Sequence, residues 1–271
     1  MGTRKSLKGC LAAALALAAV CASGLAQAQS AAAPNPPLLM AAGSLRQAMD
    51  EIMLAYRAQG GSAFAAQYGP SGKLRQEIEQ GRKADVFASA SPEHNDRLAA
   101  KRIMGPSQVF AHNDLCAVAT PEAGLDAENL IPVLASPYVR VATSTPVSDP
   151  MGDYTWQFFR KAEKKVPGFF SAMDAKALKL SGATAPRPGE KLPYVTAFEN
   201  DKADVYLMYC TNAAATRNAL PRLKVLRIPD EFNVRSAYGI SVRAGSAEGE
   251  RFARFVMSPE GRKILEKYGF N

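Results

Sequence analysis

From Pro37 onward, short apolar segments alternate with amphipathic segments, and this order constrains the fold more than any other feature of the sequence. Residues 38–42 are apolar, and from Leu45 to Tyr56 apolar side chains recur at helical spacing. Two more pairs of such segments complete a β-α-β-α-β-α pattern that ends around Arg102. This pattern predicts an α/β fold with mostly parallel sheets and helices on both faces.

The alternation continues through the rest of the chain. Apolar segments typical of strands occupy residues 115–120, 138–144 and 204–209, and a late strand is predicted over residues 236–242. Two helices are predicted to close the chain, the second capped by Ser258 with a proline at its first position. No repeat of fixed period occurs, so a repeat architecture is excluded.

The first 28 residues have the three parts of a secretory signal. A basic start precedes the apolar run Leu11–Val20, and small residues around Ala28 form a cleavage site. The apolar run is short for a membrane anchor, which is the alternative interpretation. We therefore predict cleavage after Ala28, a periplasmic mature chain, and a flexible leader over residues 29–36.

Charge and cysteine content exclude several classes of function. The formal charge is +8, and removing the three basic residues of the predicted signal leaves +5. Because basic residues are scattered, we expect no nucleic-acid partner. Cys116 and Cys210 remain in the predicted mature chain, either as one disulfide or as two buried thiols. No spacing typical of metal ligands occurs, and we expect neither a cofactor nor a directly bound metal.

Two serines stand where predicted strands pass through glycine into helices. Ser44 follows Gly43, and Ser71 lies within the segment 69–72. A helix N-terminus presents unpaired N–H groups and a partial positive charge, which favour an anion. Either serine alone could be an ordinary helix cap. Because the carboxyl ends of neighbouring parallel strands share one crevice, the two serines together predict an anion-binding site.

A third turn precedes the helix predicted after residue 153. Its backbone N–H groups at Met151 and Gly152 could donate to a ligand. We interpret Asp149 and Asp153 as helix caps, because they lack the alternating ligand series of a calcium loop. Tyr209, at the end of a predicted strand, offers a phenolic donor, although a buried core tyrosine is the simpler alternative.

Enzymatic functions have little support in the sequence. His94 and His112 are the two histidines, and no Gly-x-Ser-x-Gly motif is present. The segment 69–73 resembles a phosphate-binding loop but lacks both ends of that motif. No nucleophile, base and orienting group converge. We predict that the chain is not an enzyme, with a secreted α/β hydrolase as the alternative.

Five segments together resemble the periplasmic molybdate-binding proteins of ABC transporters. They are residues 41–45, 69–72, 84–89, 149–152 and 267–270. The resemblance covers nearly all of the predicted mature chain in order. It implies a two-lobe periplasmic-binding-protein-like fold with two crossing strands, an oxyanion held in the cleft, and a membrane permease as partner.

The resemblance also implies lobe boundaries and ligand residues. The first lobe would comprise residues 37–113 and a return segment 229–271, and the second lobe residues 114–228. The matching ligand residues are Ser44, Ser71, the Met151 N–H, a backbone donor near Val195, and the Tyr209 hydroxyl.

Three features depart from the family pattern. The predicted ligand tyrosine is followed by residues 210–212, Cys-Thr-Asn, where Gly or Ser and then an acid are usual. Met151 is bulkier than the usual small residue, and residues 182–193 form a longer connection. We predict molybdate or tungstate as ligand of a monomeric protein, with sulfate, phosphate or a small organic acid as alternatives. Arg46 is expected to speed encounter with the anion rather than to bind it.

Overall fold

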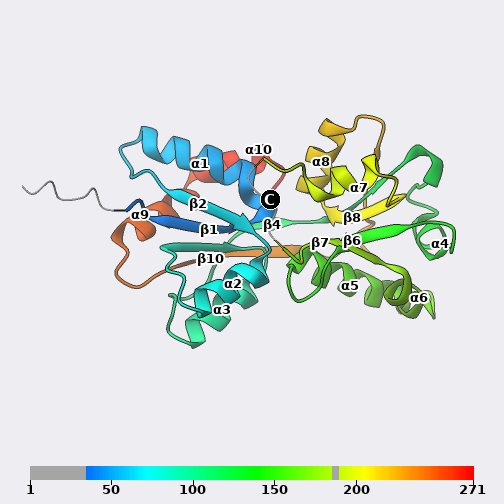
Figure 1. Cartoon of the computed structure of the whole chain (residues 1–271), viewed down its shortest axis with the longest axis horizontal. Coiled ribbons are helices and arrows are strands. Elements are labelled where there is room, and N and C mark those ends of the chain that lie inside the picture. Colours follow the sequence, from blue (N-terminus) through cyan, green and yellow to red (C-terminus); the bar gives the residue numbers. More distant parts are fainter. Residues whose placement is uncertain (1–34, 185–188) are drawn as a thin grey trace, which may run out of the picture. The chain divides into compact units, whose positions relative to one another are not determined.

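The computed structural model describes residues 35–184 and 189–271. Residues 36–271 form one compact unit that contains two five-stranded sheets (Figure 1). The predicted signal over residues 1–28 and residues 29–34 of the predicted leader lie outside the described residues, as do four positions of the 182–193 connection. Within the described ranges, no helix has the length and apolarity needed to cross a bilayer.

The first sheet has the strand order β2-β1-β3-β10-β4. Its strands are β1 (Leu38–Ala42), β2 (Ala65–Gly69), β3 (Val86–Ser89), β4 (Gln108–Asn113) and β10 (Ser236–Val242). β1 pairs in parallel with β2 and β3, whereas β10 is antiparallel to both β3 and β4.

Helices cover both faces of this sheet (Figure 1). They are α1 (Arg46–Ala58), α2 (Ser71–Glu79), α3 (Pro92–Ala100), α9 (Ala247–Val256) and α10 (Pro259–Lys267), and a 3₁₀ turn, η1 (Gly43–Leu45), precedes α1. Side chains of β1 alternate between the faces. Leu39 packs in the core that includes Met49 of α1, while Met40 packs with Leu74 of α2 and Leu98 of α3. The apolar segments of β1 and β3 are therefore buried on both faces of the sheet.

The second sheet has the strand order β7-β6-β8-β5-β9. Its strands are β5 (Leu115–Ala119), β6 (Val141–Ser144), β7 (Leu178–Ser181), β8 (Val205–Tyr209) and β9 (Lys224–Arg227). Its helices are η2 (Pro121–Ala123), α4 (Leu130–Ala135), α5 (Pro150–Glu163), α6 (Phe169–Lys176), α7 (Pro193–Glu199) and α8 (Cys210–Ala219). Figure 1 shows α7 and α8 on one side of this sheet and α5 and α6 on the other.

The chain passes between the sheets at two places that lie side by side. Asp114 alone separates β4 from β5, and residues 228–235 lead from β9 back to β10. Asn233 joins the two passages, because its Oδ1 accepts the Leu115 N–H at 3.0 Å and its Nδ2 donates to the Leu115 carbonyl at 3.1 Å.

The predicted two-lobe α/β fold is confirmed, with one correction to the strand directions. Each sheet combines two parallel and two antiparallel pairings, so the sheets are mixed rather than mostly parallel. The antiparallel strands β5 and β10 enter their sheets directly from the passages between lobes, and not through a helical crossover that would set a parallel direction. The lobe boundaries predicted at residues 113 and 228 stay a prediction.

Candidate functional site

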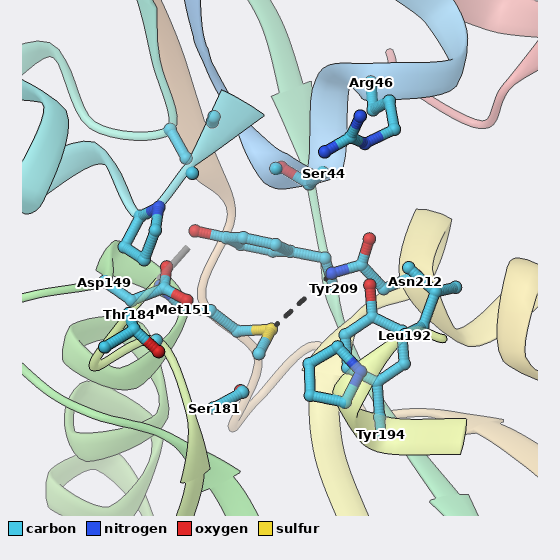
Figure 2. A pocket seen from close by; sticks show the side chains of 17 residues that line it. Ser44, Arg46, Asp149, Met151, Ser181, Thr184, Leu192, Tyr194, Tyr209 and Asn212 are labelled. Atoms are coloured by element: carbon cyan, nitrogen blue, oxygen red, sulfur yellow. Dashed lines mark hydrogen bonds between the residues drawn. The ribbon is translucent and has the colours of Figure 1, made fainter. Parts of the chain in front are cut away.

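A small pocket lies between the two sheets, where β1, β2, β7 and β8 end (Figure 2). Its volume is about 80 Å³. A water-sized sphere occupies roughly 10–15 Å³, so the space suits an ion of a few atoms. The lining residues are Ala42, Gly43, Ser44, Arg46, Gly69, Pro70, Ala90, Asp149, Met151, Ser181, Gly182, Thr184, Leu192, Pro193, Tyr194, Tyr209 and Asn212.

Ser44 lines the pocket from the turn between β1 and α1. It caps neither η1 nor α1, so the plain-cap alternative does not hold for this residue. Its Oγ instead shares a hydrogen bond of 2.9 Å with the hydroxyl of Tyr238 on β10. The Asn113 amide donates to the same tyrosine oxygen at 3.4 Å. Because Tyr238 can then donate its own proton to Ser44, the Ser44 proton is available to a ligand.

Ser71 lies behind the pocket wall. It is the first residue of α2, is 1% exposed, and its Oγ accepts the Ala90 N–H at 3.1 Å. It forms no cap bond to its helix, so the plain-cap alternative does not hold here either. Ala90 and Pro70 line the pocket, but Ser71 does not. Its predicted role as a ligand stays a prediction, and in the structure its hydroxyl positions the loop after β3.

The start of α5 contributes both Met151 and Asp149 to the pocket wall. The Met151 N–H, which was predicted to meet the anion, donates to Asp149 Oδ1 at 3.2 Å. Asp149 is therefore the predicted helix cap and also a carboxylate in the pocket. Burial raises the pKa of Asp149 to about 6, against the opposing effect of the Met151 N–H and the Ser144 hydroxyl.

Asp153 accepts the Val147 N–H at 2.8 Å and does not line this pocket. In the part of the chain that the structure describes, no cluster of three His, Cys, Asp or Glu side chains could hold a metal ion. The Asp153 carboxylate therefore serves the backbone of this turn.

Tyr209 ends β8, and Figure 2 shows its ring extending across the pocket. The side chain is 2% exposed, and its hydroxyl has no hydrogen-bond partner among the described residues. Burial holds the pKa of Tyr209 well above its usual value, so the hydroxyl keeps its proton. A buried donor without a partner costs about 1–3 kcal/mol, which an anion in the pocket would offset.

The first turn of α7 also reaches the pocket. Leu192, Pro193 and Tyr194 line it, whereas Val195 is 5% exposed and does not. The Thr196 N–H bonds back to the Leu192 carbonyl at 3.1 Å, and N–H groups before that position have no partner within the helix. The structure thus brings the neighbour of Val195 to the site, and the donor expected near Val195 stays a prediction.

Sequence reasoning did not assign Arg46 and Asn212 to the site. Arg46 was expected only to speed encounter, but it lines the pocket, with its guanidinium 4.5 Å from the centre of the Tyr68 ring. Its place two residues after Ser44, in the first turn of α1, was a usable signal. The Asn212 amide lies 3.8 Å from the Met151 sulfur and joins α8 to α5. Nothing in the sequence indicated that contact.

A disulfide joins Cys116 of β5 to Cys210, with Cα atoms 4.9 Å apart. This settles the alternative that the sequence left open. Cys210 directly follows Tyr209, and β5 pairs with β8 in the register Leu115 to Tyr209. The crosslink therefore fixes the turn that presents the tyrosine to the pocket.

The two lobes touch beside the pocket through Gly72. Its N–H donates to the Ser148 carbonyl at 3.0 Å. A Cβ at Gly72 would lie 2.4 Å from the Val147 carbonyl oxygen and 2.8 Å from that of Ser148. Only glycine allows the backbone of α2 to approach the second lobe this closely.

Comparison with known proteins places the chain among binding proteins. The model of a family described as bacterial extracellular solute-binding protein matches residues 37–271. An uncharacterised protein of Pasteurella multocida is 35% identical over 238 residues, which cover 86% of this chain and 97% of that protein. The molybdate-binding protein ModA of Escherichia coli is 25% identical over 243 residues, covering 86% of this chain and 87% of its own.

Among solved structures, the sulfate-binding protein SubI of Mycobacterium tuberculosis has a TM-score of 0.72 at 18% identity, covering 87% of this chain and 86% of that one. At that identity the likeness establishes the fold. The matched family is one of solute-binding proteins and not of enzymes, in agreement with the prediction from the sequence, and the Escherichia coli and Mycobacterium tuberculosis proteins are binding proteins by name.

Proposed function

Since the chain belongs to the family of bacterial extracellular solute-binding proteins, we propose that it captures a small tetrahedral oxyanion and delivers it to the membrane permease of an ABC transporter. In this proposal the mature protein begins after Ala28 and works as a monomer in the periplasm. A relative aligned over most of the chain is a molybdate-binding protein, so molybdate and tungstate belong to the candidate ligands together with sulfate and phosphate.

The observation that carries the proposal is the Tyr209 hydroxyl. It is a buried donor without a partner among the described residues, in a pocket of about 80 Å³ that Ser44 also lines. An oxyanion supplies acceptor oxygens to which both hydroxyls can donate their protons. A purely apolar guest would leave the Tyr209 donor unsatisfied, at the cost given above.

The expected affinity for the anion follows from its hydrogen bonds and the costs of forming them. Each hydrogen bond to a charged group contributes about 1.5–3 kcal/mol. Desolvation of the ion and ordering of the lobes offset part of that sum, so we expect micromolar affinity or tighter. The positive guanidinium of Arg46 in the wall adds electrostatic attraction to the neutral donors.

Thermal unfolding of the mature protein with a panel of anions tests the proposal. A ligand at about 100 times its Kd stabilises the folded state by roughly 2.7 kcal/mol. We expect the unfolding midpoint to rise with at least one of molybdate, tungstate, sulfate and phosphate. A response to a small organic carboxylate with silence across all four oxyanions would refute the oxyanion assignment.

A pair of tyrosine variants tests whether the ligand that raises the unfolding midpoint binds in this pocket. Tyr209→Phe should abolish most of the ligand-induced rise. Tyr56→Phe is the matched control, since the Tyr56 hydroxyl donates to Glu248 at 2.5 Å and does not line the pocket. That variant should lower the midpoint of the ligand-free protein and leave the rise with ligand unchanged. An equal loss of response in both variants would place the ligand elsewhere.

A further inference from the structure

The Asp149 carboxylate gives the pocket a hydrogen-bond acceptor, and we propose that it selects an oxyanion that still carries a proton, of which hydrogen phosphate is the simplest. The inference rests on the proposed function and narrows its ligand class. Sulfate, molybdate and tungstate are fully deprotonated at neutral pH and present only acceptors. Hydrogen phosphate presents both acceptors and one donor.

The carboxylate is fixed in the pocket wall by its neighbours. Oδ1 accepts the Met151 N–H at 3.2 Å. On the other side, a Cβ at Gly182 would lie 2.9 Å from Asp149 Oδ2 and 2.7 Å from Asp149 Cβ, so only a glycine leaves room for this side chain. Gly182 has a φ of 80°, a conformation that glycine adopts without strain. The position of the acceptor is therefore built into the backbone on both sides.

The negative charge of Asp149 is not neutralised by the protein. In residues 35–184 and 189–271, no lysine or arginine forms an ion pair with it. An ionised carboxylate has about four lone-pair positions, and the Met151 N–H and a rotating Ser144 hydroxyl can occupy two of them. Acceptor capacity remains, and Asp149 lines the pocket.

The rest of the wall suits the anionic part of such a ligand. Figure 2 shows Arg46 and Ser44 on one side of the pocket and Asp149 on another, with the Tyr209 ring between them. Across the described ranges, Arg46 has no carboxylate partner within ion-pair distance. An anion with oxygens toward Arg46, Ser44 and Tyr209 and with a proton toward Asp149 satisfies all four groups.

A fully deprotonated oxyanion fails at one of these contacts. Its oxygen would face the Asp149 oxygen with no proton between them. Repulsion between two negative groups would then replace the hydrogen bond that a protonated ligand donates to Asp149. Sites built to meet a polar hydrogen reject analogues that lack it by factors of about 10⁴. We expect a smaller preference, of at least about 100-fold, because the residue Asp149 keeps some exposure to solvent although its carboxyl lies in the pocket wall.

Calorimetric titrations of the whole mature protein at pH 8 test the inference. Phosphate is mainly the singly protonated dianion at that pH, and arsenate is a second probe with the same proton. We expect phosphate and arsenate to bind at least about 100-fold more tightly than sulfate or molybdate. Tighter binding of molybdate or sulfate than of phosphate by the wild-type protein would overturn the inference and leave the proposed function standing. Failure of every oxyanion to bind would instead overturn the proposed function.

Two variants assign the preference to the carboxylate. Asp149→Asn keeps the helix cap and supplies an amide donor, so the ratio of sulfate to phosphate affinity should rise by at least about tenfold. Asp153→Asn is the matched control, because Asp153 lies in the same helical turn and outside the pocket. Its ratio should equal that of the wild type. An unchanged ratio in Asp149→Asn would refute the role of Asp149.

Discussion

Replacing Gly72 with alanine tests whether contact between the lobes is required for tight binding. The added Cβ would stand 2.4 Å from the Val147 carbonyl oxygen, whereas Cβ contacts essentially never fall below 3.0 Å. The lobes must therefore separate by more than half an ångström at this point. The hydrogen bond from Gly72 N–H to the Ser148 carbonyl, 3.0 Å long, would be stretched or lost.

The expected magnitude follows from these two losses. Overpacking of this kind costs about 1–3 kcal/mol, and a hydrogen bond contributes about 1 kcal/mol net. A penalty of about 2–4 kcal/mol on the closed arrangement corresponds to a Kd that is roughly 30- to 700-fold weaker. The ligand-free protein can relieve the clash by separating its lobes, so its free energy of unfolding should fall by no more than about 1 kcal/mol.

Isothermal calorimetry with the best anion and urea denaturation without it measure the two quantities. Gly261→Ala is the contrasting control, since its Cβ would lie 2.3 Å from the Val256 carbonyl oxygen within the first lobe. That clash cannot be relieved by lobe separation, so stability should fall while the Kd of folded molecules stays the same. Wild-type affinity in Gly72→Ala would refute the claim that the ligand is held by lobes in contact.

Three further outcomes are expected. Tyr209→Phe should weaken anion binding by about 1.5–3 kcal/mol in calorimetry without lowering the thermal midpoint of the ligand-free protein, because the hydroxyl has no partner in the described structure. Replacing Cys116 and Cys210 together by serine should lower the free energy of unfolding in urea by up to about 4.7 kcal/mol, as the bond closes a sequence separation of 94 residues. The pKa of Asp149 is raised to about 6, so its ionisation lowers stability as pH rises through about 4 to 6, and the deficit persists above pH 6. At pH 8 the free energy of unfolding of Asp149→Asn, measured by urea denaturation, should therefore exceed that of the wild type by at most about 3 kcal/mol. At pH 4 the two free energies should be similar.

The order of strands and helices could be predicted from the sequence because it depends on local periodicity. Pairing between distant strands could not. β10 lies between β3 and β4 and is antiparallel to both, which depends on where the chain returns from the second lobe. The disulfide was undecided for the same reason, since only the pairing of β5 with β8 brings Cys116 near Cys210.

The residues of the candidate site could be predicted where they lie near the ends of strands or the starts of helices. Ser44 lies just after a strand, Tyr209 ends a strand, and Met151 lies in the first turn of a helix; all three line the pocket. Ser71 has the same sequence context, but its hydroxyl is engaged by the Ala90 N–H, a contact made by another loop. The pocket-facing role of Asp149 was equally hidden, because a capping carboxylate and a ligand-facing carboxylate have the same sequence context.

Crystals of the mature protein grown with tungstate and, separately, with arsenate would test the central claim most directly, since both ions scatter anomalously. The account predicts an anomalous peak between the lobes, with ligand oxygens about 2.7–3.2 Å from Ser44 Oγ and the Tyr209 hydroxyl. With arsenate, one ligand oxygen should also lie within hydrogen-bond distance of Asp149. A peak outside this pocket, under conditions where the ion binds tightly in solution, would contradict the account.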